Sequence, residues 1–321
     1  MNNESIRSIK GTQDILPEES MKWQSLEDQI RKISSYYGYK EIRTPAFENT
    51  KLFSRGVGEE TDIVSKEMYS WTDQGGENLT LKPELTAPVA RAYIQHNLGR
   101  IRPINKLYYI DALFRRERPQ KGRYRQFHQF GVEAFGSEHP EIDAEVIALA
   151  ISVFESLGLE GLKLNLNSIG SGECRENYRT ALQDYLKPYF NDLTETSQKR
   201  FNDNPLRILD TKAANEIEIL EDAPKISNYL TNDDQTHFDE VIEYLDILEI
   251  EYELMPKLVR GLDYYSRTTF EITSLDLGAQ NAICGGGRYD GLTEILGGKP
   301  TPGIGFAAGM ERILLAMKDD Q

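Results

Sequence analysis

The stretch LFRRERPQKGRYRQFHQFGVEAF (113–135) decides the fold of this 321-residue chain, because it predicts two strands joined by a basic loop. We expect the strands over 107–117 and 125–135, with RPQKGRY as the connection. Since successive residues of a strand face opposite sides of a sheet, each strand presents one apolar face and one polar face. The stretch therefore predicts a hairpin that lies on a core and turns its other side away from it.

The polar side of this hairpin carries groups that suit a ligand. Its apolar faces are formed by Ile110, Ala112, Phe114, Phe130, Val132 and Ala134. Its opposite faces carry Asp111, Arg115, Glu117, Phe127, Gln129 and Glu133. An arginine suits an anion, an aromatic ring suits stacking, and a glutamate suits a cationic or N–H-bearing group. An ordinary solvated sheet face shows the same alternation, but this side-chain content favours a lined pocket.

Positive charge is concentrated here although the whole chain is acidic. The formal net charge is −15, while residues 100–125 hold nine Lys and Arg against Asp111 and Glu117. A focused positive site on an acidic body suits a small polyanion or the end of a nucleic acid, not a long duplex. A solvated surface run is the alternative, but such runs usually mix both signs and contain few aromatic residues.

The composition argues against several classes of protein. No apolar run reaches the roughly 18 residues that span a membrane, and the first residues, MNNESIRSIKGTQD, contain no apolar signal core. We therefore expect a cytoplasmic protein with no membrane partner. Cys174 and Cys284 lie far apart, and the four histidines show no ligand spacing. We expect neither a disulfide framework nor a metal site built from cysteine or histidine.

The flanking sequence predicts helices and strands around the hairpin. Amphipathic spacing predicts a helix over 18–37, which Gly38 ends. A second helix is expected over 141–157, where apolar residues lie nearly all round and so predict a buried helix. A strand is expected in YKEIRTPAFE, where Pro45 interrupts it, and alternation over 162–169 predicts a half-exposed strand.

The second half of the chain begins with a change in composition and in the predicted secondary structure. Between roughly 172 and 250, acidic and polar helical segments predict an inserted helical subdomain. After it, KLVRGLDYYSRTTFEITSL returns to strand-like residues, and CGGGRYDGL predicts a glycine-rich turn. A final helix is expected from about Ala307.

The standard nucleotide-binding loops are absent from the sequence. No GxxxxGK[ST] occurs, since GGKPT (297–301) has Pro300 where a hydroxyl is needed, and GIGFAAG (303–309) is not spaced as GxGxxG. A phosphate site must therefore use arginines and a helix start, and Arg312 lies near such a start.

Four ordered motifs resemble the histidyl-tRNA synthetase family. They are FRRERPQKGRYRQFHQFGVEAFG, LVRGLDYYSRTTFE, GGGRYDGL and GIGFAAGMERILL, and the similarity runs from GTQDILP (11–17) nearly to the C-terminus. The second resembles the family's histidine-specific signature, the fourth resembles motif 3 of class II synthetases, and EIRTPAFE resembles the dimer-forming motif 1. The resemblance implies an α+β class II catalytic fold, with a mostly antiparallel sheet of six to seven strands flanked by helices, in a homodimer.

The resemblance also implies an activity in protein biosynthesis. Histidine and ATP, with Mg²⁺ on the triphosphate, give histidyl-adenylate and pyrophosphate, and the histidyl group then passes to the 3′ end of tRNA(His). The residues implied to bind ATP are Arg115, Glu117, Arg123, Phe127 and Arg312. Those implied to bind histidine are Glu84, Thr86, Gln129, Glu133, Tyr264, Tyr265 and Tyr289. Arg260 and Arg115 are implied to be catalytic, and Arg118 and Gln120 to contact the acceptor end of the tRNA.

Each assignment has a structural alternative when it is taken alone. Tyr264 and Tyr265 also fit core aromatic residues at strand spacing. Glu84 also fits an acid at the start of a helix, and Arg260 fits a surface cation. The ordered motifs favour the functional interpretation of all four together.

The chain departs from the family pattern at two places. The family usually has Arg-Pro-Glu-Gly-Thr where this chain has KPELT (82–86), so Leu85 replaces a glycine. The family also continues into an anticodon-binding domain, whereas this sequence stops nine residues after Arg312. We therefore expect a catalytic domain over 1–321, with the helical insertion inside it and the anticodon-binding domain absent.

Two other functions fit the same resemblance. A non-catalytic regulatory subunit of ATP phosphoribosyltransferase, in histidine biosynthesis, shares this fold and lacks the anticodon-binding domain. A regulatory binder need not keep ATP-contacting arginines, yet Arg115, Arg123, Arg260 and Arg312 are all present. A third function is a free-standing enzyme that aminoacylates something other than tRNA. The sequence favours the histidine-activating enzyme.

Overall fold

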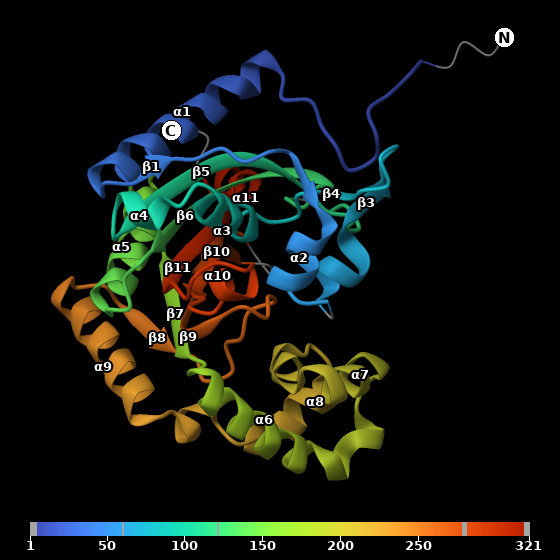
Figure 1. Ribbon diagram of the computed structural model, residues 1–321, viewed down its shortest axis with the longest axis vertical. Helices are drawn as coiled ribbons and strands as arrows, with labels where there is room; N and C mark the ends of the chain where they lie inside the picture. Colours follow the sequence, from blue (N-terminus) through green and yellow to red (C-terminus); the bar gives the residue numbers. More distant parts are fainter. Residues whose placement is uncertain (1–4, 60, 121, 278–280, 318–321) are drawn as a thin grey trace.

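A mixed sheet of eight strands forms the centre of the computed structural model, which describes residues 5–59, 61–120, 122–277 and 281–317. Figure 1 shows it with helices around it. The strands are β1 (Lys40–Glu41), β2 (Phe47–Asn49), β3 (Tyr69–Thr72), β4 (Asn78–Leu81), β5 (Asn105–Phe114), β6 (Gln126–Phe135), β7 (Leu162–Ser168), β8 (Tyr252–Leu254), β9 (Ser266–Ser274), β10 (Ala282–Arg288) and β11 (Gly303–Gly309). The α-helices are α1 (Pro17–Tyr36), α2 (Thr50–Gly56), α3 (Thr86–Gln95), α4 (Leu98–Ile101), α5 (Glu141–Ser156), α6 (Gly172–Leu186), α7 (Glu195–Asp203), α8 (Ala214–Ile219), α9 (Asn232–Ile247), α10 (Leu292–Ile295) and α11 (Met310–Ala316).

The strand order of the large sheet is β1-β5-β6-β11-β10-β9-β7-β8. All neighbouring pairs are antiparallel except β1 with β5 and β7 with β8, which are parallel. The α+β fold class is therefore confirmed. The sheet has eight strands, not six or seven, because two short strands extend its edges. A second sheet has the order β2-β4-β3 and lies beside α2.

The predicted hairpin is confirmed as β5 and β6, and its register places Asp111 opposite Gln129. β5 ends at Phe114, so Arg115 and Glu117 belong to the connecting loop and not to the strand. Bulky residues at alternate positions, such as Phe130 in β6, point to one side of the sheet. The predicted apolar face thus lies against the main core.

The main core lies between one face of the large sheet and α1, α5, α9 and α11. Trp23 and Leu26 of α1, Val146 of α5 and Ile313 of α11 are buried against strand residues such as Phe306. The helices predicted at 18–37 and 141–157 are confirmed as α1 and α5, and Gly38 follows α1 with φ +80°. Such a φ suits glycine, which carries no Cβ. This core fixes the rear face of β6 and leaves its front face for the site.

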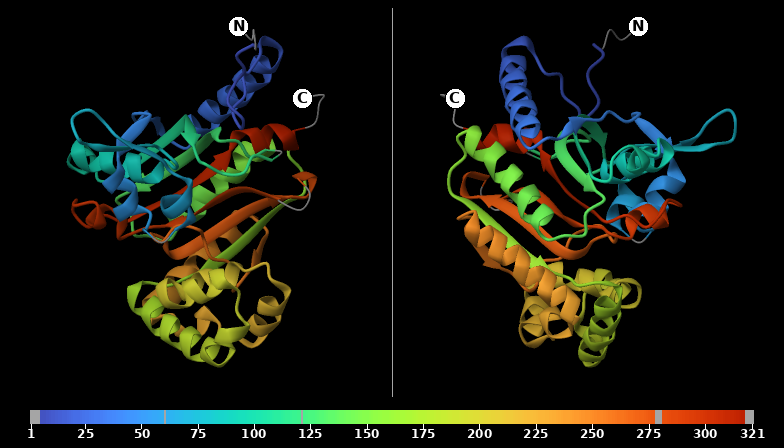
Figure 2. Two further views of the ribbon diagram at one scale, coloured as in Figure 1. Left: turned by 90° about the vertical axis from the view of Figure 1, so that its right-hand side faces the viewer. Right: turned by 60° about the vertical axis from the view of Figure 1, so that its left-hand side comes forward.

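Helices fill most of the predicted insertion. From α6 to the 3₁₀ turn Ile226–Tyr229, the chain forms a body beyond one edge of the sheet, drawn in yellow-green in Figure 2. We call residues 172–229 the helical segment. α9 behaves differently, because its Phe238, Val241 and Leu245 are buried in the main core against α5. The sequence thus indicated the helices of this region, but α9, the last of them, packs on the main body.

Three local predictions need correction. CGGGRYDGL contains the strand β10 and not only a turn, since Gly285 and Gly286 lie inside it. The last helix begins at Met310 and not near Ala307, which lies in β11. The strand over 162–169 is more buried than its alternation suggested, because Asn167 and Ser168 are covered as well. In the described residues, no helix combines the length and apolarity needed to cross a membrane.

Candidate active site

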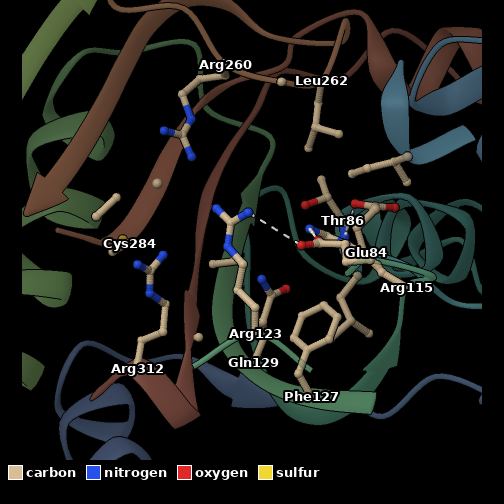
Figure 3. Close-up of a pocket in the computed structure, with 18 of the residues that line it drawn as sticks. Glu84, Thr86, Arg115, Arg123, Phe127, Gln129, Arg260, Leu262, Cys284 and Arg312 are labelled. Carbon is tan, nitrogen blue, oxygen red and sulfur yellow. Dashed lines mark hydrogen bonds and ion pairs between the residues drawn. The ribbon is translucent and has the colours of Figure 1, made fainter. Parts of the chain in front are cut away.

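A cavity of about 440 Å³ opens on the front face of β6. Its wall takes side chains from β5, β6, β9, β10 and β11, from the 115–125 loop, from the start of α3 and from the irregular segment 255–265. Figure 3 shows arginines approaching it from several sides. Elements distant in sequence therefore meet at one place, as a ligand site requires.

We call the half of this cavity formed by Arg115, Arg123, Phe127 and Arg312 the arginine end. Arg115 donates from Nε to the carbonyl of Pro83 at 2.8 Å, and its guanidinium lies 5.1 Å from the ring centroid of Phe127. Arg123 pairs with Glu117 at 3.5 Å. Glu117 and Glu67 thus lie on the same wall as these three arginines, which outnumber them, so the end is positive and suits an anion with several charges.

Arg312 reaches this end from the start of α11, and its neighbour Glu311 anchors that helix. Glu311 accepts hydrogen bonds from the backbone N–H of His128 at 2.9 and 3.0 Å and contacts the Nδ1 atom of its ring at 3.0 Å. The His128 ring also meets Trp23 edge-on, with 4.8 Å between ring centroids. His128 follows Phe127 in β6, and Glu311 precedes Arg312 in α11. These contacts therefore fix the backbone that carries the Phe127 ring and the Arg312 guanidinium. Burial, and then Arg123, lower the pKa of Arg312.

Arg260 lies in the middle of the cavity. Its Nη1 donates to Glu271 of β9 at 2.7 Å, while its buried Nε has no partner among the described residues. Room for the guanidinium comes from Gly285 of β10, where a Cβ would collide with it. Gly285 of CGGGRYDGL therefore serves the close approach of a side chain and not a turn, whereas Gly291 lies in a turn.

The other half of the cavity is acidic, and we call it the carboxylate end. It is lined by Glu84, Thr86 and Tyr109, and the buried side chains of Glu133 and Tyr289 support this wall from behind. Glu84 accepts from the backbone N–H groups of Thr86 and Ala87, at 2.9 and 3.0 Å, and so caps the start of α3. Burial nevertheless raises the pKa of Glu84 to about 7.

The loop before α3 tolerates the residue that departs from the family pattern. Leu85 has φ −117° and ψ −18°, which any residue can adopt. Its side chain is buried beside α3. Glycine is therefore not needed at this position for the backbone to turn into the helix.

Glu133 is the centre of the carboxylate end. Its Oε1 accepts from the hydroxyls of Thr86 at 2.8 Å and Tyr109 at 3.1 Å, and its Oε2 accepts from Tyr289. Burial raises the pKa of Glu133 to about 8, although the Tyr289 and Thr86 hydroxyls oppose this effect. Gly305 of β11 leaves room for this carboxyl, since a Cβ there would collide with it.

The structure brings together most of the residues that the sequence singled out. Those on the cavity wall are Glu84, Thr86, Arg115, Glu117, Arg123, Phe127, Gln129, Arg260, Tyr264, Tyr265 and Arg312. Glu133 and Tyr289 lie one layer behind that wall and are buried. Arg118 and Gln120 are exposed on the loop and do not line the cavity.

Other residues on the wall were not singled out from the sequence, among them Asp62, Tyr109, Arg207 and Glu271. Tyr109 and Glu271 were accessible in principle, because each occupies the cavity-facing register of a strand. Asp62 pairs with Arg207 at 3.5 Å across two segments distant in sequence. Local patterns in the sequence do not signal such a contact.

The described residues contain no group of three or more His, Cys, Asp and Glu side chains placed to hold a metal ion. Cys174 and Cys284 are both buried free thiols, and Cys284 lines the cavity. Burial raises the pKa of the Cys174 thiol to about 11. A thiol held neutral in this way is a poor nucleophile.

Comparison with known proteins gives a consistent family. A family model described as Histidyl-tRNA synthetase matches residues 11–313. A protein of Natranaerobius thermophilus named histidine–tRNA ligase is 53% identical over 316 residues, which cover 98% of this chain and 75% of that protein. A protein of the same name from Desulfitobacterium hafniense is 54% identical over 315 residues, covering 98% of this chain and 74% of its own length.

Solved structures give the same fold. A crystal structure of the apo histidyl-tRNA synthetase of S. aureus matches with a TM-score of 0.80 and 41% identity, covering 98% of this chain and 74% of that one. A Bacillus halodurans protein, named ATP phosphoribosyltransferase regulatory subunit/histidyl-tRNA synthetase, matches with a TM-score of 0.71. It covers 99% of this chain and 84% of its own, but at 24% identity it supports only the likeness of fold.

Proposed function

This chain belongs to the histidyl-tRNA synthetase family, and on that premise we propose that it activates histidine with ATP and transfers the histidyl group to the 3′ end of tRNA(His). The observation that carries the proposal is one cavity with two unlike ends, an arginine end and a carboxylate end, with Arg260 between them. A reaction that joins a polyanion to a substrate with a cationic amino group and N–H donors needs such a pair of ends.

ATP occupies the arginine end in this proposal. Arg115 binds the α-phosphate, Arg123 and Arg312 hold the outer phosphates, and Glu117 accepts from the adenine amino group. The guanidinium of Arg115 already covers one side of the Phe127 ring, so adenine stacks on the other side. Both Arg115 and Arg123 lie within 4 Å of Glu117, which keeps their charges together before ATP arrives.

Histidine occupies the carboxylate end. Its α-amino group binds Glu84, Thr86 and Gln129, whose side chains line the same wall. Its imidazole lies between Tyr265 and the Glu133 network, with Tyr264 and Tyr289 around it. Because Glu133 is buried, a ligand without an N–H donor would displace water from this site without giving the carboxyl a hydrogen bond in return, which disfavours binding.

Adenylate formation needs no nucleophile from the protein, because the carboxylate of histidine attacks the α-phosphorus of ATP. Negative charge increases on the α-phosphate oxygens in the transition state, and Arg115 and Arg260 stabilise it. The remaining contribution is alignment of the two substrates. Magnesium belongs to the substrate in this scheme, since Mg²⁺ is commonly bound through phosphate oxygens together with few protein ligands.

Several broader features are part of the same proposal. The chain acts in the cytoplasm as a catalytic domain over 1–321 with a helical subdomain inside it, and the exposed Arg118 and Gln120 meet the acceptor end of the tRNA. A homodimer forms around β1 and β2. Support for it comes from Phe47 of β2 and Trp71 of β3, which are 50% and 41% exposed and whose rings meet edge-on.

The regulatory-subunit alternative is not favoured. Relatives more than 50% identical are named histidine–tRNA ligase, whereas the structure named ATP phosphoribosyltransferase regulatory subunit/histidyl-tRNA synthetase is 24% identical. The cavity also keeps the arginines that a non-catalytic histidine binder does not require.

The test is ATP–pyrophosphate exchange by the purified chain with each amino acid in turn. Exchange that depends on histidine alone is the expected result, followed by charging of tRNA(His). A folded protein that binds histidine without catalysing exchange would contradict the proposed reaction and favour a regulatory role.

A further inference from the structure

The segment between β8 and β9, residues 255–265, carries much of the cavity wall without forming a helix or a strand. Arg260, Leu262, Tyr264 and Tyr265 of this segment all line the cavity. A backbone without regular hydrogen bonds keeps one conformation only if other groups bind its carbonyl and amide groups. The source of those partners therefore decides what positions the side chains.

Two of the partners come from the helical segment. Arg175, in the second turn of α6, donates from Nη1 to the carbonyl of Tyr265 at 2.7 Å and from Nη2 to the carbonyl of Asp263 at 3.4 Å. Asn204, after α7, donates from Nδ2 to the carboxylate of Asp263 at 2.8 Å. The first contact is the tighter one, and it reaches the residue that we place against the imidazole of histidine.

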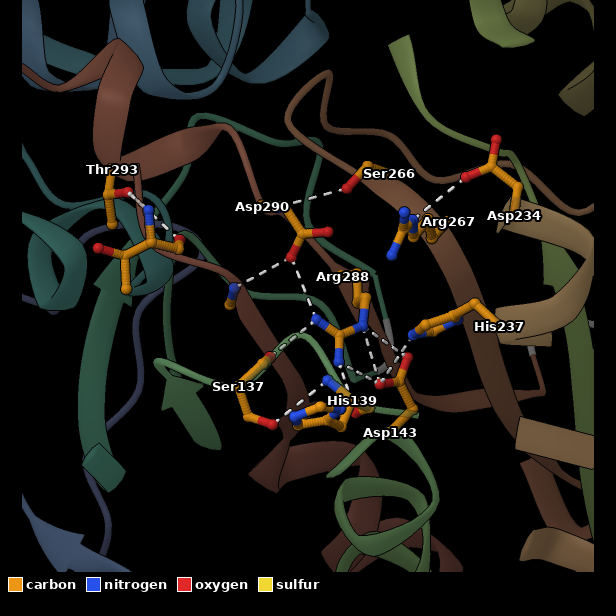
Figure 4. A network of polar contacts seen from close by, with 12 residues as sticks. Ser137, His139, Asp143, Asp234, His237, Ser266, Arg267, Arg288, Asp290 and Thr293 are labelled. Atoms are coloured by element: carbon orange, nitrogen blue, oxygen red, sulfur yellow. Dashed lines mark hydrogen bonds and ion pairs between the residues drawn. The ribbon is translucent and has the colours of Figure 1, made fainter. Parts of the chain in front are cut away.

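The base of α6 is itself fixed to the start of β9. Asp234, in the first turn of α9, accepts from the backbone N–H of Ser171 at 3.0 Å and from its hydroxyl at 2.8 Å. Its other oxygen accepts from Nε of Arg267 at 3.1 Å, a contact drawn in Figure 4. The start of α6 and the start of β9 thus share one carboxylate, so Arg175 works from a fixed base.

We propose that Arg175 is a positioning residue for the activation of histidine, because its guanidinium holds the backbone from which Tyr264, Tyr265 and, a few residues earlier, Arg260 project. The helical segment then contributes to the first half-reaction and not only to contacts outside the cavity. This inference rests on the proposed function, since it assigns Tyr265 to the amino-acid side of the reaction. A planar guanidinium suits two carbonyl acceptors better than an ammonium does.

Arg179 supplies a matched control. It lies on the same helix one turn further on, is exposed, and donates to the carbonyl of Asn202 inside the helical segment at 3.0 Å. Replacing Arg179 removes the same charge from the same helix without touching 255–265. Any difference between Arg175→Ala and Arg179→Ala therefore reports the contact with the cavity segment.

The experiment measures histidine-dependent ATP–pyrophosphate exchange for the full chain and for Arg175→Ala, Arg175→Lys and Arg179→Ala. Histidine is varied at saturating ATP, and ATP is varied at saturating histidine. We expect Arg175→Ala to lower kcat/KM for histidine by about tenfold or more, since small displacements of substrate-positioning groups can cost up to about a hundredfold. The KM for ATP should stay within about twofold of the unchanged chain, with Arg175→Lys intermediate and Arg179→Ala unaffected.

Each outcome decides the inference. A kcat/KM for histidine in folded Arg175→Ala equal to that of Arg179→Ala would overturn it, and so would a rise in the KM for ATP as large as the rise in the KM for histidine. If Arg175→Ala shows no thermal unfolding transition and is therefore not folded, Arg175→Lys decides the question. Unchanged histidine kinetics in Arg175→Lys would overturn the positioning role. Failure of the unchanged chain to catalyse exchange would instead refute the proposed function, and the inference with it.

Discussion

The two ends of the cavity are built in opposite ways. At the carboxylate end Glu133 is 0% exposed and accepts from three hydroxyl groups, all supplied by buried residues. At the arginine end Arg123 is 43% exposed, and its contact with Glu117 spans 3.5 Å. The first end is arranged before any ligand arrives, whereas the second supplies charge from a loop. The difference matches the two substrates, because selection among amino acids needs buried, fixed partners and a triphosphate needs mainly charge.

The largest effect is expected at Arg260, which stands between the two ends. Arg260→His should lower histidine-dependent exchange by about 10²–10³-fold, since a fixed cation at the developing charge is lost. Within the part of the chain that the structure describes, its guanidinium makes one ion pair, with Glu271, so the melting temperature should change little. Exchange kinetics and thermal unfolding of the same preparation measure both quantities. Loss of folding together with activity would show that Arg260 is structural and that the two ends need no bridge.

Glu133→Gln tests the preorganised end. The free protein holds Glu133 protonated near neutral pH, and the N–H donors of bound histidine favour its ionised form. The variant keeps the shape of the side chain but cannot ionise, and hydrogen bonds to charged groups contribute about 1.5–3 kcal/mol. We expect kcat/KM for histidine to fall by about ten- to a hundredfold, with the KM for ATP nearly unchanged. Substrate-saturation kinetics for each substrate measure the two effects separately. A larger change in the KM for ATP than in histidine kinetics would break the distinction between the ends.

The arginine end was more predictable from the sequence than the carboxylate end. Arg115 and Arg123 lie in one basic run, and Phe127 follows at strand alternation, so adjacent residues and a period of two were sufficient. Glu133 was found by the same alternation. Its donors Thr86 and Tyr289 were implied only by the family resemblance, because they come from segments far apart in the chain. A single sequence does not report such tertiary contacts.

The same contrast, between features that local patterns predict and features that tertiary contacts decide, holds for the fold. The amphipathic helix α1 and the helix α5, which is apolar nearly all round, were predicted almost to the residue, because packing on the core dictates where their apolar residues lie. The glycines of β10 were mistaken for a turn. They lie in a strand, where side chains would collide with Arg260 and Phe270, but a run of glycines in the sequence is also typical of a turn. The buried ion pair of Arg288 and Asp143, shown in Figure 4 beside His237, joins β10 to α5 and has no local signature.

The third prediction concerns how the buried Glu133 makes the free energy of unfolding depend on pH. The pKa of Glu133 is raised from 4.5 to about 8, so between these values the native state holds a proton that the unfolded chain has released. The free energy of unfolding should therefore fall as pH rises from about 5 to 8. The side chain introduced by Glu133→Gln does not titrate. The free energy of unfolding of the unchanged chain should therefore fall more steeply than that of the variant, by about 1.4 kcal/mol for each pH unit in this range. Urea unfolding of both proteins at pH 5, 6.5 and 8 measures the difference, and since Glu84 is present in both, its own contribution largely cancels. Parallel pH profiles would show that Glu133 is not held neutral.

The smallest effect is expected at Arg123, where the arginine end is most exposed. Its ion pair with Glu117 is partly solvated, and ion pairs of this kind contribute about 0–1 kcal/mol. Loss of a similarly exposed contact with a phosphate in Arg123→Ala should therefore raise the KM for ATP by about fivefold at most. The effect should shrink as salt is raised toward about 0.5 M, because exposed charges are screened, while the defect of Glu133→Gln should not. Arg118→Ala is the matched control, since it removes a neighbouring exposed cation that does not line the cavity. A salt-independent defect in Arg123→Ala would mean that this arginine is fixed as firmly as the carboxylate end, and the contrast between the two ends would disappear.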